Sequence, residues 1–204
     1  RGLTQEGVVP IENSLEGSVN DTLDVLIQQV NLFIRKEMVL SVRHCLLGQL
    51  ETRLEDVRVV YSHPQALAQC RGFLARRFPG AQLIAALSTA AGVEEMMASR
   101  DVAVAIGTKR AGELYGAKVF GESIQDSSTN VTRFVVLALG DHEPTGNDKT
   151  SLCLSFSGDK PGLLYSVLGE FAQRNVNLTK IESRPTKETL GTYKFLIDLE
   201  GHRQ

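Results

Sequence analysis

The segment from residue 57 to residue 139 alternates short β-branched runs with stretches of helical periodicity. The strand-like runs are 57–61, 83–86, 102–106 and 133–139, and the helical patterns between them are 64–78, 89–99 and 109–115. Strands that alternate with helices form right-handed crossover units. This pattern predicts an α/β fold with a mostly parallel sheet covered by helices on both faces. Such sheets bind ligands at the carboxyl ends of their strands.

A second, smaller domain is indicated by residues 141–149 (DHEPTGNDK), which have the composition of a linker. This linker divides the chain into residues 1–140 and residues 150–204. In the smaller part a strand, a helix and two further strands are expected at 152–156, 161–174, 176–184 and 193–199. Asp159 is the expected cap of the helix. The β-α-β-β order corresponds to a ferredoxin-like module without its last helix and strand.

Composition excludes several classes of protein. The 22 basic residues are balanced by 24 acidic ones, which argues against a nucleic-acid partner. No apolar run approaches the roughly 18 residues of a membrane span, so we expect no membrane insertion. Cys45, Cys70 and Cys153 form no CxxC pair and have no spaced histidine partners, so neither zinc nor a disulfide framework is predicted. We expect all three to be buried apolar residues in a reducing, cytoplasmic setting.

Small polar side chains gather at four junctions between expected elements. These junctions are 10–24 (PIENSLEGSVNDTLD), 62–69 (SHPQALAQ), 88–89 (ST) and 127–134 (SSTNVTRF). Helix capping explains much of this, with Ser18 or Asn20 as one cap and Ser62 with Gln65 as a capping box. His63, alone at a helix start, is more simply a bystander than a base or ligand.

Helix capping does not explain two residues at these junctions. Gln69 lies one helical turn beyond Gln65 and has no capping role, and Arg133 at the start of an apolar strand offers a bidentate partner for a carboxylate. Together the junctions predict a cleft for a small carboxylate ligand. The sequence has no GxSxG, P-loop or GxGxxG motif, so acyl transfer and nucleotide chemistry have no support.

At these same residues the sequence resembles the prephenate dehydratase family. The matching segments, in the order of the family, are PIENSLEGSVND (10–21), SHPQALAQC (62–70), STAA (88–91), IQDSSTNVTRF (124–134), PGLL (161–164) and ESRP (182–185). The resemblance implies a two-lobed catalytic domain like type II periplasmic binding proteins in residues 1–140. It also implies a C-terminal ferredoxin-like ACT regulatory domain in residues 150–204. Members usually begin with a further strand and helix, so we expect a chain that is short at both ends.

By this resemblance the chain is a carbon-oxygen lyase that converts prephenate to phenylpyruvate in L-phenylalanine biosynthesis, without a metal or an organic cofactor. The matching site residues are Asn13, Ser62, Gln69, Thr132 and Arg133. We expect Thr132 to donate a hydrogen bond or a proton to the leaving hydroxyl, and Arg133 or a helix N-terminus to hold a carboxylate. If both lie in a regular strand, their side chains point to opposite faces. Asn13, Ser62 and Gln69 would orient the substrate.

The resemblance also implies feedback inhibition by L-phenylalanine bound at the ACT domain. The matching effector-binding residues are Gly162, Leu163, Leu164, Glu182, Ser183, Arg184 and Pro185. A homodimer or homotetramer is expected. Two alternatives stay open, namely an arogenate dehydratase and a non-catalytic protein that senses an amino acid or another carboxylate.

Overall fold

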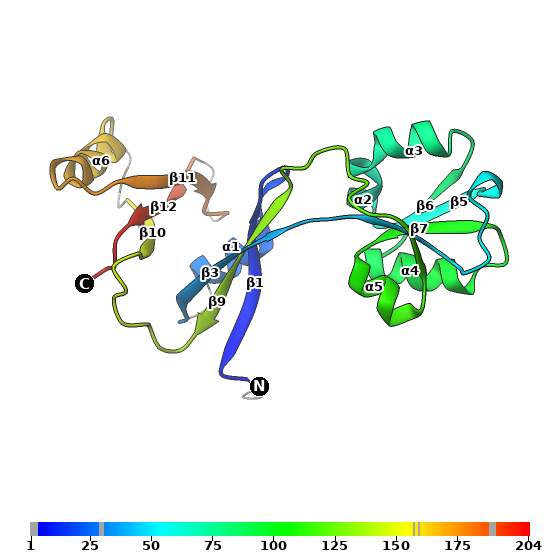
Figure 1. Cartoon of the computed structure of the whole chain (residues 1–204). Helices are drawn as coiled ribbons and strands as arrows, with labels where there is room; N and C mark the ends of the chain where they lie inside the picture. Colours follow the sequence, from blue (N-terminus) through cyan, green and yellow to red (C-terminus); the bar gives the residue numbers. More distant parts are fainter. Residues whose placement is uncertain (1–3, 29–30, 157, 159, 188–190) are drawn as a thin grey trace. The chain divides into compact units, whose positions relative to one another are not determined.

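The computed structural model describes residues 4–28, 31–156, 158, 160–187 and 191–204 (Figure 1). It divides into two compact units. The first unit comprises residues 1–11, 19–38 and 134–204, and the second comprises residues 12–18 and 39–133. The mixed α/β class expected from the sequence is confirmed. Among the described residues, no helix is both long and apolar enough to cross a lipid bilayer.

The second unit contains a five-stranded sheet. Its order is β6 (Gln82–Ala85), β5 (Val59–Ser62), β7 (Ala103–Gly107), β4 (Cys45–Gly48) and β8 (Lys118–Gly121). Strand β5 is parallel to β6 and β7, whereas β4 is antiparallel to β7 and β8. The prediction of a mostly parallel sheet is therefore wrong for half of it. The parallel rule holds for strands joined through a helical crossover, but β4 precedes the alternating segment and inserts between β7 and β8.

Helices cover both faces of this sheet, as predicted. They are α2 (Pro64–Gln69), α3 (Arg71–Arg77), α4 (Thr89–Ala98) and α5 (Lys109–Tyr115), and a 3-10 turn spans Leu54–Asp56. Leu46 faces the cluster that includes residues of α2 and α3, and its neighbour Leu47 faces the cluster that includes residues of α4 and α5. Figure 1 shows these helix pairs on opposite sides of the sheet. Successive strand residues alternate in direction, so two layers of core form around one sheet.

The single helix predicted over 64–78 is two helices that break at Cys70. The cause is Asp126, whose carboxylate accepts hydrogen bonds from the backbone N–H groups of Gly72 (2.8 Å) and Phe73 (3.1 Å). A side chain from a distant segment thus gives α3 its own start. Ser88 caps α4 as the sequence indicates, because its hydroxyl accepts from the backbone N–H of Ala91 at 3.0 Å.

A four-stranded sheet has strands that belong to both units. Its order is β2 (Gly17–Ser18), β1 (Glu6–Asn13), β9 (Val131–Ala138) and β3 (Phe33–Ser41), and α1 (Asn20–Gln28) follows β2. Ile11, Leu23, Val135 and Leu137 form its buried cluster. The sequence predicted only β9 and α1 here. Strands β1 and β3 were missed because their polar and apolar residues do not alternate cleanly.

The C-terminal part of the first unit has the predicted β-α-β-β order. Its elements are β10 (Lys149–Ser155), α6 (Leu163–Gln173), β11 (Leu178–Pro185) and β12 (Tyr193–Glu200), and the antiparallel sheet has the order β10-β12-β11. Helix α6 begins after Gly162, which has a φ of 87° that favours glycine. The expected cap Asp159 lies outside the described residues.

All three cysteines are free, and two of them are buried as expected. Cys153 is exposed, so the expectation that it is a core residue is wrong. Along β10 the half-buried positions are Leu152 and Leu154, and Cys153 lies on the other face of the strand. The two-residue period of the strand decides its exposure, not its apolar character.

Candidate active site

Asn13 and Thr132 lie within direct hydrogen-bonding distance, although 119 residues separate them in the chain. Asn13 ends β1 and Thr132 is the second residue of β9. The Asn13 amide donates to Thr132 Oγ1 at 3.0 Å and to Asn130 Oδ1 at 2.8 Å. Its own oxygen accepts from the backbone N–H groups of Leu15 (2.9 Å) and Glu16 (3.2 Å), which fixes the amide orientation. The Thr132 oxygen thus accepts one hydrogen bond, and its hydrogen can be donated elsewhere.

Gln69 extends this network from the end of α2. Its Oε1 accepts from Asn130 Nδ2 and from His44 Nε2, each at 2.8 Å. Its Nε2 donates to Glu16 Oε1 at 3.4 Å. We call the side chains of Asn13, Gln69, Asn130, Thr132 and His44 the amide network. All of them belong to the second compact unit, and the network joins three of the polar junctions, 10–24, 62–69 and 127–134.

Two members of the amide network were missed by sequence reasoning. Asn130 is 2% exposed and lies two residues before Thr132, so both side chains leave the chain on the same side. The polar turn that contains Asn130 was the available signal. His44 is 5% exposed, and its Nδ1 has no partner among the described residues. The only local signal for it is a histidine directly before the apolar run of β4.

Arg133 points away from Thr132, as the alternation of a strand requires. Its Nε lies 3.2 Å from Glu12 Oε2, and its side chain is 18% exposed. The same alternation operates in β1, where Glu12 and Asn13 are adjacent. One face therefore carries the pair Asn13 and Thr132, and the other carries the ion pair Glu12 and Arg133. The structure does not bring the Arg133 guanidinium into the amide network.

Ser62 is fully buried at the end of β5, and its hydroxyl donates to the carbonyl of Ile106 in β7 at 2.7 Å. The predicted capping box of Ser62 and Gln65 is wrong, because this bond turns the Ser62 hydroxyl towards the sheet. The cap of α2 is His63, whose Nδ1 accepts from the backbone N–H of Gln65 at 3.3 Å. Ser62 fixes the end of β5 against β7 and is not part of the amide network.

The first turn of α4 packs directly on Ser62. A Cβ built on Gly92 would lie 2.9 Å from the Cα of Ser62, so only glycine permits this approach. The N-terminus of α4 and the residues of α2 therefore gather at the carboxyl ends of the parallel strands. Ser88 satisfies the N–H of Ala91, and the N–H groups of Thr89 and Ala90 have no acceptor within the helix. This end of α4 favours a negatively charged group.

The site does not supply a thiolate nucleophile. Cys70 ends α2 and is fully buried. Burial and the nearby negative charge of Asp126 raise the pKa of the Cys70 thiol to about 12. Among the described residues, the three-residue group with metal-ligating geometry is Asp141, His142 and His202, none of which belongs to the amide network. The network consists of hydrogen-bond donors and acceptors held in fixed orientation.

The residues expected to bind an effector lie in the C-terminal part of the first unit. Gly162, Leu163 and Leu164 form the start of α6, and Glu182, Ser183, Arg184 and Pro185 end β11. Arg184 is 9% exposed and donates to Asn20 Oδ1 and Asp24 Oδ1 of α1. It also contacts Glu182 Oε1 at 3.3 Å. The hydrogen bonds of Asp24 with Lys187 and Arg184 lower the pKa of this carboxyl.

The fold and the site define an α/β protein with a hydrogen-bonding site and a C-terminal module of the βαββ kind. The family model described as prephenate dehydratase matches residues 1–142, and the model described as ACT domain matches residues 154–204. The chain belongs to the prephenate dehydratase family and carries an ACT domain.

Curated relatives agree with this assignment. A prephenate dehydratase of Methanocaldococcus jannaschii is 44% identical over 202 residues, which cover 97% of this chain and 72% of that protein. An Arabidopsis thaliana protein named arogenate dehydratase/prephenate dehydratase 2, chloroplastic, is 41% identical, with 98% of this chain and 55% of that protein covered. The chain thus spans between half and three quarters of the length of these two relatives.

A solved structure also resembles the chain over almost its whole length. It is a prephenate dehydratase from Arthrobacter aurescens in complex with L-Phe. The TM-score is 0.87 at 37% identity, and the match covers 98% of this chain and 66% of that one.

Proposed function

We propose that the chain converts prephenate to phenylpyruvate with loss of water and carbon dioxide. The observation that supports this most strongly is the amide network, in which Asn13, Gln69 and Thr132 from three separate family motifs are joined by hydrogen bonds of 2.8 to 3.0 Å. Independent motifs whose side chains converge at one place indicate one site.

The reaction requires alignment of the two breaking bonds and a proton for the departing oxygen. The ring carboxylate leaves as carbon dioxide, the electrons of that bond complete the aromatic ring, and the C–O bond opposite breaks. The departing oxygen must be protonated to leave as water. We assign this donation to Thr132, because Asn13 donates to its oxygen and so directs its hydrogen away from Asn13. A threonine hydroxyl is a weak acid, so much of the acceleration comes from orientation of the breaking bonds.

The other network members hold Thr132 and the substrate in place. Gln69 accepts from both Asn130 and His44, which fixes its carbonyl end. Asn13 and Gln69 then orient the substrate. Ser62 contributes indirectly, because its hydrogen bond to the Ile106 carbonyl fixes the end of β5, and α2 begins directly after it. Each of these residues is fixed by partners outside the reacting atoms, as preorganised sites require.

A substrate carboxylate has two candidate partners. The N-terminus of α4 offers the N–H groups of Thr89 and Ala90, which have no acceptor within the helix, together with the positive end of the helix dipole. Arg133 offers a guanidinium, but this is already paired with Glu12 on the other face of β9. We therefore assign the carboxylate to α4 and propose that Arg133 acts on the reaction only by holding β9 against β1.

We propose that the ACT domain binds L-phenylalanine and lowers the activity. The Arthrobacter aurescens relative was solved with L-Phe, and Gly162 to Leu164 with Glu182 to Pro185 match the family's effector motifs. Arg184 connects this region to α1 through Asp24 and Asn20. Helix α1 follows closely on the segment that contains Asn13. A change in β11 on effector binding thus has a covalent and a hydrogen-bonded path to the amide network.

We also propose a cytoplasmic location and a homodimer or homotetramer. All three cysteines are free, which suits a reducing compartment. The ACT region exposes large apolar side chains, with Tyr165 at 81%, Ile181 at 48% and Tyr193 at 49% exposure. Apolar groups of this size on a small antiparallel domain favour association between copies.

Arogenate dehydratase is the nearest enzymatic alternative, because plant relatives carry that name. Purified protein should be incubated with prephenate and, separately, with arogenate. Phenylpyruvate is then followed by its absorbance in alkali, and phenylalanine by chromatography. We expect turnover of prephenate that L-phenylalanine reduces. Faster turnover of arogenate would replace the proposed substrate, and binding of L-phenylalanine without turnover of either compound would indicate a sensor.

A further inference from the structure

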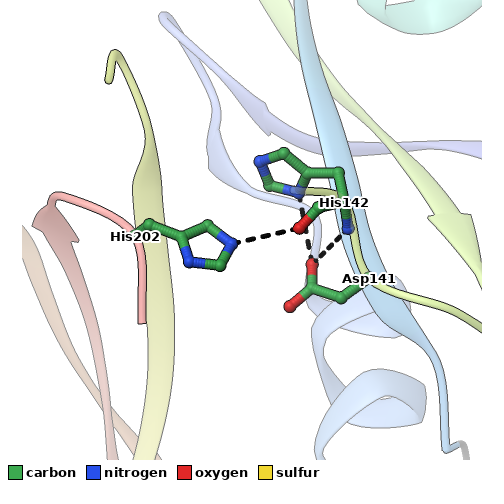
Figure 2. Close-up of side chains that lie close together, drawn as sticks. All are labelled: Asp141, His142 and His202. Carbon is green, nitrogen blue, oxygen red and sulfur yellow. Dashed lines mark hydrogen bonds and ion pairs between the residues drawn. The ribbon is translucent and has the colours of Figure 1, made fainter. Parts of the chain in front are cut away.

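Two histidines and an aspartate from distant parts of the first unit lie together near the end of the chain. His142 and Asp141 follow β9, and His202 follows β12, 60 residues further on. One ligand atom from each lies within 4.8 Å of the others, and all three side chains are half-buried. Figure 2 shows the His142 ring directed at the Asp141 carboxylate and the His202 ring directed at the His142 carbonyl oxygen. We propose that Asp141, His142 and His202 form a binding site for Zn²⁺.

The spacing of the polar atoms fits a tetrahedral ion. His142 Nδ1 lies 3.2 Å from Asp141 Oδ1, and His202 Nε2 lies 3.2 Å from the backbone carbonyl oxygen of His142. Zinc bonds of about 2.0 to 2.1 Å place tetrahedral ligands about 3.3 Å apart. Two of the separations among these four groups thus already match zinc coordination, and the three side-chain ligand atoms lie within 4.8 Å of one another. The two rings are nearly perpendicular, at 84°, so both can present a nitrogen edge to the same ion.

Two of the proposed ligands are also held in orientation by a neighbouring side chain. Asp148 Oδ1 lies 3.1 Å from His142 Nε2, the ring nitrogen that points away from Asp141. Arg203 Nε lies 2.6 Å from Asp141 Oδ2 and so leaves Oδ1 directed at His142. Without zinc, His202 Nδ1 accepts from the backbone N–H of Gln204 at 3.3 Å and Nε2 carries the ring proton. Ligation through Nε2 moves this proton to Nδ1 and replaces the contact with Gln204. Carboxylates that orient metal-bound histidines in this way are a regular feature of zinc sites.

The charge and the access of the site suit a divalent cation. Asp141 and Asp148 supply two negative charges, and Arg203 removes one of them. Imidazole and carboxylate ligands favour zinc over the harder Ca²⁺ and Mg²⁺. A hollow of about 350 Å³ is bordered by one proposed ligand, His202, and by Asp148, which contacts His142. Sequence spacing did not reveal the site because its ligands come from two segments without a local motif.

Zinc at this position would fasten the 141–148 segment to the end of the chain. The segment already contacts residues after β12, since Gly201 N–H donates to the Asp148 carbonyl at 2.8 Å. An ion bound in the folded state adds to stability according to its concentration and affinity. We therefore expect zinc to raise the melting temperature of the unit that contains the ACT region.

The test is calorimetric titration of metal-stripped protein with ZnCl2. We expect one zinc ion bound per chain, and a loss of affinity on the order of 100-fold or more in His202→Ala, which removes a ligand. Asp148→Asn keeps all three ligands and replaces the carboxylate that orients His142 and also accepts from Thr145 and Gly146, so we expect a loss of roughly 10- to 100-fold. Far-UV circular dichroism shows whether each variant is folded. If His202→Ala does not fold, Asp148→Asn still tests the proposal.

His63→Ala and Cys153→Ser are the matched controls, since each removes one potential zinc ligand away from the cluster. Both should bind zinc like the parent chain. The proposal is overturned if the parent binds no zinc, if His202→Ala and Asp148→Asn bind it as tightly as the parent, or if either control weakens binding as much as His202→Ala does.

Discussion

The five-stranded sheet and the three-stranded sheet bury their residues in different ways. All five residues of β7 are buried, whereas β10 alternates between exposed and half-buried positions. Helix α4 buries Gly92, Val93 and Met96, but none of the eleven residues of α6, all of which the structure describes, is buried. The proposed catalytic residues thus lie beside a sheet covered on both faces, and the ACT region has a thinner core. Less buried elements open more easily, which suits the response to an effector that we propose for this region.

The largest difference between the two sheets should appear in core truncations. Leu47→Ala in β4 removes a fully buried side chain from the five-stranded sheet, and we expect a loss of about 2 to 5 kcal/mol in the free energy of unfolding. Leu154→Ala in β10 removes a half-buried side chain and should cost about 1 kcal/mol. Urea denaturation followed by circular dichroism measures both. Equal losses of stability in the two variants would contradict the difference in burial between the two sheets.

Gly92→Ala should be the next largest effect. The new Cβ would lie 2.9 Å from Ser62 Cα and 3.1 Å from its backbone nitrogen, so α4 has to move away from β5. We expect a loss of about 1 to 3 kcal/mol in stability, together with lower turnover of prephenate because the α4 N-terminus shifts. Stability comes from urea denaturation and turnover from phenylpyruvate absorbance. A variant as stable and as active as the parent would show that α4 tolerates the shift.

The same substitution in α6 should act in the opposite direction. Gly169 is a helical glycine with no atom within 4 Å of an added Cβ, so Gly169→Ala meets no obstacle. Alanine favours the helix by about 0.5 to 1 kcal/mol over glycine, and we expect stabilisation of that size. The thermal melting temperature should rise accordingly. A fall would mean that this face of α6 is covered, for example by a second copy of the chain.

The smallest effect concerns Asp24, which joins α1 to Arg184 and Lys187. Its pKa is lowered from 3.8 in the folded protein, so its contribution is complete above that value and is lost as the pH falls below it. Asp24→Asn should therefore be less stable than the parent at pH 7, and the difference should shrink as the pH falls below about 3.8. Asp101→Asn is the exposed control. A difference independent of pH would argue against the ion pairs.

The alternation of strands and helices from residue 57 onwards was enough to predict most elements of the second unit to within a few residues. It could not predict that β4 would insert antiparallel beside β7, because that pairing depends on contacts between distant segments. It also could not place the break at Cys70, since Asp126 causes it from 54 residues away. Local sequence patterns predict local structure, whereas the pairing of β4 and the helix break are set by tertiary contacts.

For the candidate site, too, the sequence predicted some residues, and others became apparent only through tertiary contacts. The motifs identified Asn13, Gln69 and Thr132, which the structure brings into one network. Strand alternation already indicated that Arg133 would face away from Thr132, and its pairing with Glu12 agrees with that. His44 could not be found from the sequence, because a single histidine before an apolar run gives no sign of the Gln69 side chain that it meets.

The central claim is that the Thr132 hydroxyl, held by Asn13, serves the departing oxygen of prephenate. The most direct measurement is kcat for prephenate in Thr132→Val, with Thr179→Val in β11 as the control for the same substitution in a strand of the ACT region. We predict that kcat falls by about 10²-fold or more in Thr132→Val and stays at the parent value in Thr179→Val. If Thr132→Val is folded and retains most of the parent kcat, the role of Thr132 is wrong.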